Sequence, residues 1–567
     1  MAEEPKFERR PIAAVSLNTV GYLPKSQKIA SIRGLNGEFV VRSAASSHEV
    51  VRGSLARVSD NSTPLRDAIY FADFSAVSEP GTYALKVAGE DNRIECRVAD
   101  DLFNWPFYCS VRAMYLWRCG CEVQGEFAGD TFRHAACHLD DGYLDYVDDS
   151  PSHQNVRRDA RGGWHDAGDY NKYTVNGAFT AGMMLMAWEH FGDRLKTLKF
   201  DIPESSNAMP DYLDEVRWEI EWLLKMQADD GSAYHKLSTL QFGGFIAPDK
   251  ETEKRYFSPW GSAATADLAA VAAQAARVYR PYDPEFAERC VVAAQKSYAF
   301  LEAHPEYQAA NLRAFGTGAY ETRDRDERLW AAAELWETTG DDLYLQDLTE
   351  RITAAARRRP DEPIVDSNWD WSEVRNLGLL TFALSQRMGG EELREKVRKD
   401  VVRAADEIAT TAGEHPYGRP LGAKYYWGCN GTVVRLAMNL HAAEVITGDA
   451  KYRAAMLDGI NFVFGRNVHG CSYVTGLGRN PPLFPHDRRS AGDNVRGPWP
   501  GYLVGGPWPA AEDWHDAEGD YRTNEIAINW NGALIYALAA FVEPQTFPES
   551  INRYHNKPNE KNSAANL

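Results

Sequence analysis

The sequence predicts a multidomain protein in which an immunoglobulin-like β-sandwich is followed by a much longer all-α domain. Residues 12–99 contain short alternating segments between turn residues, whereas residues 100–545 contain long amphipathic segments. The chain has 567 residues, which is too long for one hydrophobic core. Residues 546–567 are rich in Asn, Glu, Lys and Ser, and we expect them to form a disordered tail.

Apolar and polar residues alternate in the expected strands of the first domain, and Gly, Pro, Asn and Asp separate them. Examples are residues 28–32, 38–41, 68–72 and 82–87. About seven strands in fewer than 100 residues favour a sandwich of the immunoglobulin type. There is no Cys-Trp-Cys pattern, so an antibody-type domain is not expected, and this region contains no catalytic set.

The second region repeats a helix-turn-helix pattern. Helices are expected at residues 216–226, 264–280, 286–303, 328–338 and 391–412, where apolar residues recur three and four apart. Residues 339–344 (TGDDLY) and 447–452 (TGDAKY) each lie between two such segments. Gly suits the end of the first helix and Asp the start of the next. Repeated helix pairs over this length favour a helical toroid or solenoid rather than a bundle.

Composition restricts the partners. The formal net charge is -19, which argues against nucleic acid or an anionic membrane, and no apolar run approaches the ~20 residues of a membrane span. Aromatic residues make up 12% of the chain, with 16 Trp and 27 Tyr. They suit a carbohydrate or another flat ligand, and an aromatic-rich core explains them equally well.

The cysteines and the first residues bear on the cellular compartment of the protein. Eight cysteines are too sparse for a disulfide scaffold in so long a chain. The first residues are polar and lack the apolar core of a signal peptide. We therefore expect either an intracellular protein or a secreted one shown without its leader.

Two aspartates in residues 162–173 are candidates for acid-base chemistry. Asp166 and Asp169 are separated only by Ala167 and Gly168, and such small residues allow a tight turn that directs both carboxylates into one cavity. Aromatic residues that could grip a sugar flank them: Trp164, Tyr170 and Tyr173. Asp-Gly pairs are also common in ordinary turns, so the pair alone is weak evidence.

Two further stretches lie near the other end of the chain. Glu525 begins an apolar helical segment, where a carboxylate also simply stabilises the helix dipole. His486 and Arg488 lie in a loop rich in Gly and Pro, where they can donate to hydroxyl groups. Most loop residues of this kind are only solvated.

Together the three stretches resemble glycoside hydrolase family 9. Residues 472–488 match the family's histidine-containing signature, and six residues match its carboxylate signature: Trp514, Asp516, Tyr521, Glu525, Ala527 and Asn531. Gly532 departs from the Ala or Ser usual in the family, which should affect only packing behind the carboxylate. The resemblance runs from the N-terminal region to about residue 541.

The resemblance implies an (α/α)6 barrel behind an immunoglobulin-like module, and inverting hydrolysis of β-1,4-glucans. Asp169 then looks like the general base, Asp166 helps to hold the water, and Glu525 looks like the general acid. An inverting enzyme sets its two carboxyl groups roughly 6.5–9.5 Å apart, so that water fits between them. The remaining candidates bind substrate: His486, Arg488 and Tyr521 beside the cleaved bond, and Trp260, Trp369, Trp371, Tyr426 and Trp427 as sugar platforms. For each platform aromatic, burial in the core is the alternative.

The resemblance also implies metals. Zinc is expected on Cys119, Cys137, His138 and His165, a ligand set that suits tetrahedral Zn²⁺. Cys121, His134 and His153 are rival ligands, and buried free thiols are the alternative. Calcium is expected at Glu204, Asn207, Asp211 and Asp214, where oxygen ligands precede a helix. Asp211 and Asp214 can instead be charges of the first helical turn.

Three functions are compared. We expect a monomeric endo-acting cellulase that acts on β-1,4-glucan chains and binds neither nucleic acid nor membranes. The alternative is an exo-acting relative that releases glucose, cellobiose or glucosamine, and the acidic charge would suit a cationic glucosamine. An inactive carbohydrate-binding protein would lack the acid or the base, whereas Asp166, Asp169 and Glu525 are all present.

Overall fold

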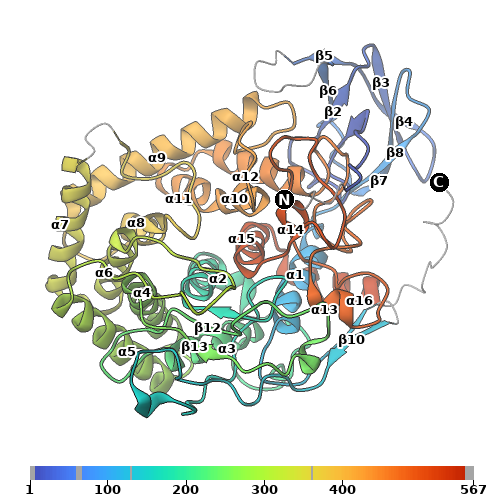
Figure 1. Cartoon of the computed structure of the whole chain (residues 1–567). Coiled ribbons are helices and arrows are strands. Elements are labelled where there is room, and N and C mark those ends of the chain that lie inside the picture. The colour runs from blue at the N-terminus through green and yellow to red at the C-terminus, as the bar shows by residue number, and fades with distance from the viewer. Residues whose placement is uncertain (1–6, 59–66, 128–129, 359–361, 556–567) are drawn as a thin grey trace.

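The computed structural model describes residues 7–58, 67–127, 130–358 and 362–555 (Figure 1). A small β-rich domain lies at one edge of a large ring of helices. This arrangement agrees with the predicted order of a sandwich followed by an all-α domain.

The N-terminal domain is a sandwich of two antiparallel sheets. Within the described residues, one sheet has the order β1-β2-β6-β5 and the other the order β4-β3-β7-β8. The strands are β1 (Val15–Ser16), β2 (Ile29–Arg33), β3 (Glu38–Ser43), β4 (Glu49–Ser54), β5 (Ala56–Arg57), β6 (Ile69–Asp73), β7 (Gly81–Val87) and β8 (Ile94–Val98). Alternate residues such as Ile32, Val41 and Leu85 fill the space between the sheets, which confirms the predicted sandwich.

The helical domain is a double ring. Its inner helices, each packed against the next, are α2 (Thr174–Leu195), α4 (Ser262–Tyr279), α6 (Arg325–Thr339), α8 (Arg375–Leu384), α10 (Cys429–Arg435) with α11 (Ala437–Thr447), and α15 (Ile528–Ala539). The outer helices are α1 (Asn104–Leu116), α3 (Asp211–Lys225), α5 (Pro284–Ala303), α7 (Asp342–Arg358), α9 (Glu391–Glu414) and α12 (Ala450–Val463). In the part of the chain that the structure describes, six inner and six outer positions form the predicted (α/α)6 barrel.

The sequence explains which helices lie inside. Every residue of α15 is buried, and all but two of its residues, Asn529 and Asn531, are apolar or glycine. In α7 the buried residues form one stripe: Tyr344, Leu348 and Ile352. Gly340 and Gly448 end α6 and α11 with positive φ values of 74° and 72°, as the two repeated motifs predicted.

The other elements are short and connect or flank the helices of the ring. They are the hairpin β9 (Val123–Phe127) and β10 (Asp130–His134), the three-stranded sheet β11 (Lys172–Tyr173), β12 (Lys236–Ser238) and β13 (Tyr256–Phe257), and the helices α13 (Arg488–Gly492), α14 (Tyr521–Asn524) and α16 (Phe547–His555). Short 3₁₀ turns are Pro151–His153, Pro248–Lys250 and Pro544–Thr546.

The prediction of a disordered tail from residue 546 is wrong at its start. Helix α16 packs against α1, and the Ser550 hydroxyl donates to Asp101 at 2.8 Å. Phe547 and Ile551 are only 2% and 7% exposed, since they are four apart and face the barrel. The polar composition of the whole segment concealed this apolar pair. Residues 556–567 lie outside the described residues.

The sandwich is bonded directly to the barrel. The Asn18 amide donates to Asn461 Oδ1 at 2.8 Å, the Thr19 N–H donates to the Phe464 carbonyl at 2.9 Å, and the Ser31 hydroxyl donates to the Pro416 carbonyl at 2.6 Å. Asn18 is fully buried there. These bonds hold the sandwich against α12 and the segments that follow α9 and α12.

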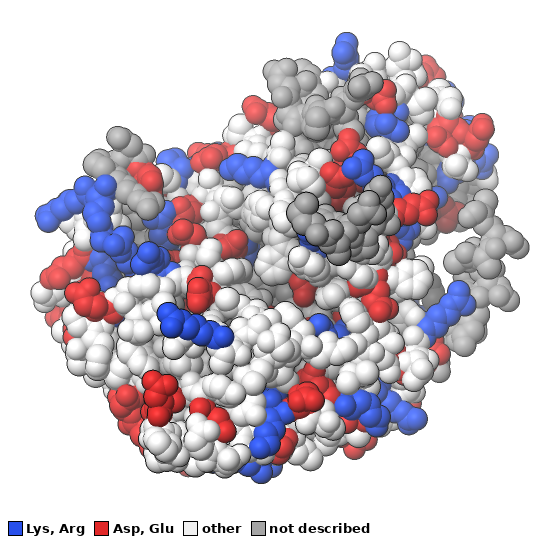
Figure 2. Space-filling view, viewed as in Figure 1, with Lys and Arg blue, Asp and Glu red and all other residues white. Residues whose placement is uncertain are grey.

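Charged side chains of both signs are interspersed on the face shown in Figure 2. Basic side chains gather near α7, whose last turn contains Arg357 and Arg358. Across the described ranges, none of the helices combines the length and the apolar character that crossing a bilayer requires.

Candidate active site and metal centre

The three predicted carboxyl groups lie on one rim of the barrel. Asp166 and Asp169 belong to the loop that leads into β11 and α2, and Glu525 lies between α14 and α15. Because α2 and α15 are neighbours in the inner ring, their N-terminal ends meet at this rim. The Ile528 N–H at the start of α15 donates to the Asp166 carbonyl at 2.9 Å. The fold therefore joins two sequence-distant stretches directly.

Asp166 is buried and fixed from two sides. Its Oδ1 accepts from the Asn176 amide at 2.7 Å, and its Oδ2 accepts from the Tyr320 hydroxyl at 2.9 Å. Tyr320 has a positive φ of 47°, and His235 Nε2 lies 2.6 Å from the preceding Ala319 carbonyl. The sequence analysis missed Asn176 and Tyr320, because neither belongs to a motif.

Asp169 is only 6% exposed and shares its Oδ2 between two donors. The Asn171 amide donates at 2.6 Å and the Tyr173 hydroxyl at 3.3 Å. Burial raises the pKa of Asp169, while the positive charge of Arg488 and the hydrogen bond from Asn171 oppose that rise. In Asp166 both burial and the negative charge of Asp169 raise the pKa, which lies well above the usual range. Asp169 is thus the member of the pair that ionises more readily.

The pKa of Glu525 is also raised. Burial, followed by the negative charges of Asp169 and Asp166, raises the pKa of Glu525 well above its usual value. Arg488 opposes this rise without cancelling it. Of the three carboxyl groups, Asp169 is therefore the one whose pKa is raised least, and it lies on the same rim as Glu525, whose raised pKa suits a proton donor.

His486 joins the aspartate loop to the stretch that contains Glu525. Its N–H donates to the Asn524 carbonyl at 2.8 Å, beside Glu525, and its Nδ1 lies 2.7 Å from the Glu518 carbonyl. Gly168 lies directly beneath it, and a Cβ there would stand 2.2 Å from the His486 carbonyl oxygen. Only glycine allows the aspartate loop to approach so closely.

Arg488 is buried against the same loop. Its N–H and its Nη1 donate to the Gly168 carbonyl at 3.0 and 2.8 Å, and its Nε donates to the Gly243 carbonyl at 3.1 Å. Tyr521 lies at the surface with 52% of its area exposed, and its ring centroid is 6.0 Å from that of His486. All three predicted substrate-binding residues of this stretch are therefore close to the carboxyl groups.

The predicted sugar platforms have different environments. Trp369 is only 2% exposed and donates to Asn439 at 2.8 Å, so its assignment as a platform is wrong. Helices α2 and α11 enclose the Trp369 side chain, and a single sequence does not reveal this contact. Trp371 is half-buried and contacts Tyr320 edge-on at 4.9 Å, close to Asp166.

The remaining three platform candidates are half-buried. Trp260 packs edge-on against Phe300 at 5.1 Å, beside α5. The Tyr426 hydroxyl donates to Asn368 at 2.9 Å, and Trp427 contacts Trp530 of α15 at 5.4 Å. Trp427 is thus the one of the three that packs against the helix following Glu525.

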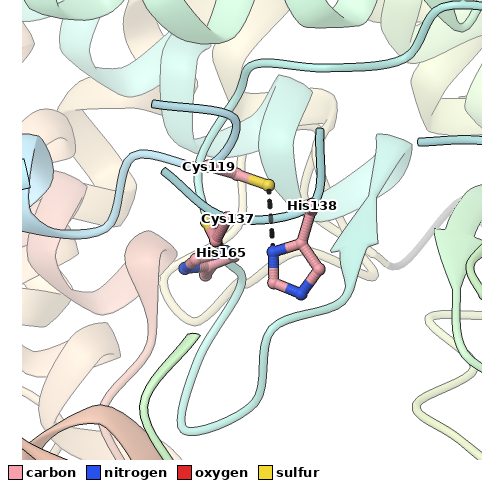
Figure 3. A group of neighbouring side chains, drawn as sticks. All are labelled: Cys119, Cys137, His138 and His165. Atoms are coloured by element: carbon pink, nitrogen blue, oxygen red, sulfur yellow. Dashed lines mark hydrogen bonds between the residues drawn. The ribbon is translucent and has the colours of Figure 1, made fainter. Parts of the chain in front are cut away.

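Four metal-ligating side chains gather next to the aspartate loop (Figure 3). The ligand atoms of Cys119, Cys137, His138 and His165 all lie within 4.8 Å of one another, and all four residues are buried. Cys119 Sγ is 3.7 Å from His138 Nδ1, and Cys137 Sγ is 3.8 Å from His165 Nε2. Ligands about 2.1–2.3 Å from a tetrahedral ion stand about 3.6 Å apart, so the set fits.

The chemistry of these donors also fits a cation. Burial alone would raise the pKa of Cys119, but the hydrogen bond from Cys137 and the charges of Lys172 and Arg255 lower it well below its usual range. Burial lowers the pKa of His165 to about 3, which keeps its imidazole neutral. A thiolate and a neutral imidazole are the forms that bind metals, and these directions favour them at Cys119 and His165.

The outer contacts follow the pattern of metal sites. His138 Nε2 lies 3.3 Å from a carboxylate oxygen of Glu251, which fixes the ring from its far side. The rival ligands are not part of this group: Cys121 is partly exposed, and His153 Nδ1 faces Asp148. The His134 ring lies 6.5 Å from that of His165, and its Nδ1 faces the Ala135 carbonyl. The sequence analysis did not identify Glu251.

Three of the four residues predicted to bind calcium have other partners. Asp211 accepts from Lys199 at 2.7 Å and from the Phe200 N–H at 2.9 Å, while Glu204 forms an ion pair with Arg118 at 3.0 Å. Asn207 Oδ1 accepts from the Met209 N–H. Asp211 and Asp214 occupy the first turn of α3, which is the alternative stated above. In the described ranges, the groups of potential metal ligands do not include this loop.

The barrel and its rim define a glycoside hydrolase of the acid-base type. The sequence pattern of glycosyl hydrolase family 9 matches residues 105–538, and that of the cellulase N-terminal ig-like domain matches residues 10–92. The chain therefore belongs to glycosyl hydrolase family 9, as its motifs indicated.

Similar proteins cover almost the whole chain. Endoglucanase D of Acetivibrio thermocellus is 46% identical over 546 residues, which span 96% of this chain and 85% of that protein. A xyloglucan-specific endo-beta-1,4-glucanase of Bacteroides ovatus is 34% identical, with 94% of each chain covered. The crystal structure of a metagenome-derived family 9 endoglucanase superposes with a TM-score of 0.86 at 33% identity, covering 93% of this chain and 98% of that one.

The raised pKa of Glu525 leads to a prediction about how the free energy of unfolding depends on pH. An unfolded glutamate titrates near about pH 4.3, so above that pH the unfolded chain releases a proton that the folded chain keeps. The free energy of unfolding that Glu525 contributes therefore falls as the pH rises toward its folded pKa. Glu525→Gln cannot ionise, and we expect its stability relative to the parent to increase as the pH rises above about 4.3.

Urea unfolding at several pH values measures this difference. Glu302→Gln, which changes an exposed carboxyl on α5, is the matched control. A difference between Glu525→Gln and the parent that stays constant with pH would contradict the raised pKa.

Proposed function

We propose that the chain is an inverting, endo-acting glycoside hydrolase that cleaves β-1,4-glucosidic bonds of cellulose and soluble β-glucans. The observation that carries the proposal is that Glu525, Asp166 and Asp169 lie together on one rim of the barrel, where burial raises the pKa of Glu525 well above its usual value. The 46% identity to an endoglucanase over 96% of the chain supports endo action over exo action.

In this mechanism Glu525 gives its proton to the glycosidic oxygen as the bond from that oxygen to the anomeric carbon breaks. Asp169 takes a proton from a water molecule whose oxygen bonds to the anomeric carbon from the opposite face. The product is the inverted anomer, and one water is consumed. Asp166, held by Asn176 and Tyr320, would orient the water, and His486, Arg488 and Tyr521 would contact the sugar.

Product analysis tests the proposal as a whole. On carboxymethylcellulose we expect viscosity to fall well before reducing ends accumulate, because an endo-acting enzyme cuts within chains. Proton NMR of fresh cello-oligosaccharide digests should show the α-anomer first. Rapid release of reducing ends without a viscosity change would support the exo-acting alternative. Early β-anomer would indicate retention and contradict the role of Asp169.

Two isosteric variants test the acid and the base. Glu525→Gln and Asp169→Asn should each lose roughly 10²–10⁴-fold in turnover on a natural glucan while remaining folded, since positioned acid-base groups contribute about that much. Aryl glycosides with good leaving groups need less protonation, so they should restore the turnover of Glu525→Gln more than that of Asp169→Asn. Near-parental turnover of either variant on the glucan would contradict that residue's role.

We also propose that the Cys/His cluster holds a structural zinc ion. Two thiolates and two imidazoles would fill a tetrahedral zinc, which suits a structural rather than a catalytic role. His165 is followed directly by Asp166, so a bound ion would hold the aspartate loop in place. Calcium at Glu204, Asn207, Asp211 and Asp214 stays a sequence prediction, and the contacts of Asp211 favour the helix-charge alternative.

Metal analysis of the purified protein tests the zinc proposal. We expect about one zinc per chain in the parent and none in Cys137→Ser, and a lower melting temperature in that variant because bound metal stabilises the folded state. Cys290→Ser, another buried thiol on α5, is the matched control and should retain zinc. A parent purified without chelator that contains no zinc would contradict the proposal.

A further inference from the structure

The segment between β12 and residue 251 places apolar side chains in solvent at the rim of the barrel. Phe242, Phe245 and Ile246 are 48%, 39% and 38% exposed. Grouped exposed apolar side chains often mark a binding surface, whereas scattered ones need no explanation. We call residues 242–246 the rim wall.

The segment that contains the rim wall is anchored on both sides of the wall and within it. The Thr239 N–H donates to Asn171 Oδ1 at 2.9 Å, beside Asp169, and Glu251 contacts His138 of the metal cluster at 3.3 Å. Between these ends, the Tyr170 hydroxyl donates to the Ile246 carbonyl. The backbone of the wall is therefore fixed by groups of the active site itself.

Arg488 holds the middle of the wall against the aspartate loop. It donates to the Gly243 carbonyl at 3.1 Å, and its guanidinium carbon lies 5.3 Å and 5.4 Å from the ring centroids of Phe242 and Phe245. Cation–π contact orients both rings while leaving much of their surface exposed. Exposure of these rings is thus a property of an ordered surface.

The rim wall continues the row of rings beside the carboxyl groups. Phe245 meets His486 edge-on with centroids 5.2 Å apart, and Tyr521 lies 6.0 Å from His486. His486 in turn forms a bridge with the backbone of Glu525. Aromatic surface therefore extends outward from the acid along the rim.

We infer that Phe242 and Phe245 bind a glucosyl unit of the substrate chain beyond the one at the cleaved bond. In a β-1,4-glucan every hydroxyl group is equatorial, so each ring presents C–H faces that stack on aromatic rings. The wall makes the enzyme select chains of several units over short ones. This inference rests on the proposed function and assigns two specificity-determining residues to the same site.

Binding to an inactive enzyme separates this contact from catalysis. In the Glu525→Gln background, Phe242→Ala and Phe245→Ala should each weaken cellohexaose binding about 2- to 10-fold by calorimetry, which corresponds to about 0.5–1.5 kcal/mol for one aromatic contact. Phe245→Tyr keeps the ring and should restore binding. Leu343→Ala, which removes an equally exposed apolar side chain on α7, should change nothing.

Kinetics on cello-oligosaccharides of increasing length provide the second measurement. The parent's KM should decrease as glucosyl units are added to the substrate. Each alanine variant should lack the decrease that one of these units contributes, while kcat on the longest chain stays near the parental value. Unchanged binding and unchanged length dependence in both alanine variants would overturn the inference and leave the proposed function standing. Failure of the Glu525→Gln parent to bind any cello-oligosaccharide would instead contradict the proposed function. A change in sedimentation of the alanine variants with unchanged sugar binding would assign the wall to contact with a second copy and overturn the inference.

Discussion

The site depends on the contact between α2 and α15, which closes the inner ring. That contact brings the start of α15 to the aspartate loop, where Ile528 donates to the Asp166 carbonyl. Gly532 in α15 faces Thr180 of α2, and a Cβ there would stand 3.1 Å from the Thr180 methyl carbon. The departure from the family's usual Ala or Ser thus lets the two helices approach closely. The position of Glu525 relative to Asp166 and Asp169 follows from helix packing rather than from either loop alone.

The aspartate loop has little regular structure of its own, so buried polar contacts hold it. Arg255 is fully buried, pairs with Asp141, and donates to the Tyr170 carbonyl and to Cys119 Sγ. Lys172 also pairs with Asp141 at 3.2 Å. Buried ion pairs cost desolvation energy and seldom add net stability. These pairs instead fix the position of the aspartate loop, because the same network borders both the Cys/His cluster and the two aspartates.

Sequence motifs predicted the residues whose neighbours are local. Asp166 and Asp169 share one turn, Glu525 precedes its helix, and Gly340 ends α6, so short patterns suffice for them. The prediction that Trp369 is a sugar platform was wrong because its burial depends on helices far away in the chain. Tyr320 and Glu251 were missed for the same reason: their partners, Asp166 and His138, come from other segments. Tertiary contacts of single residues leave no pattern in one sequence.

Arg488 shows how position and electrostatics are joined in this site. It donates to the carbonyls of Gly168 and Gly243, so one side chain spans the aspartate loop and the rim wall. Its charge also opposes the rise in pKa of Asp169 and of Glu525. A lysine would supply the charge from one flexible ammonium group, whereas the planar guanidinium fixes several donors at once and stacks on aromatic rings. The geometry of the two loops, and not only their charge, therefore requires arginine at this position.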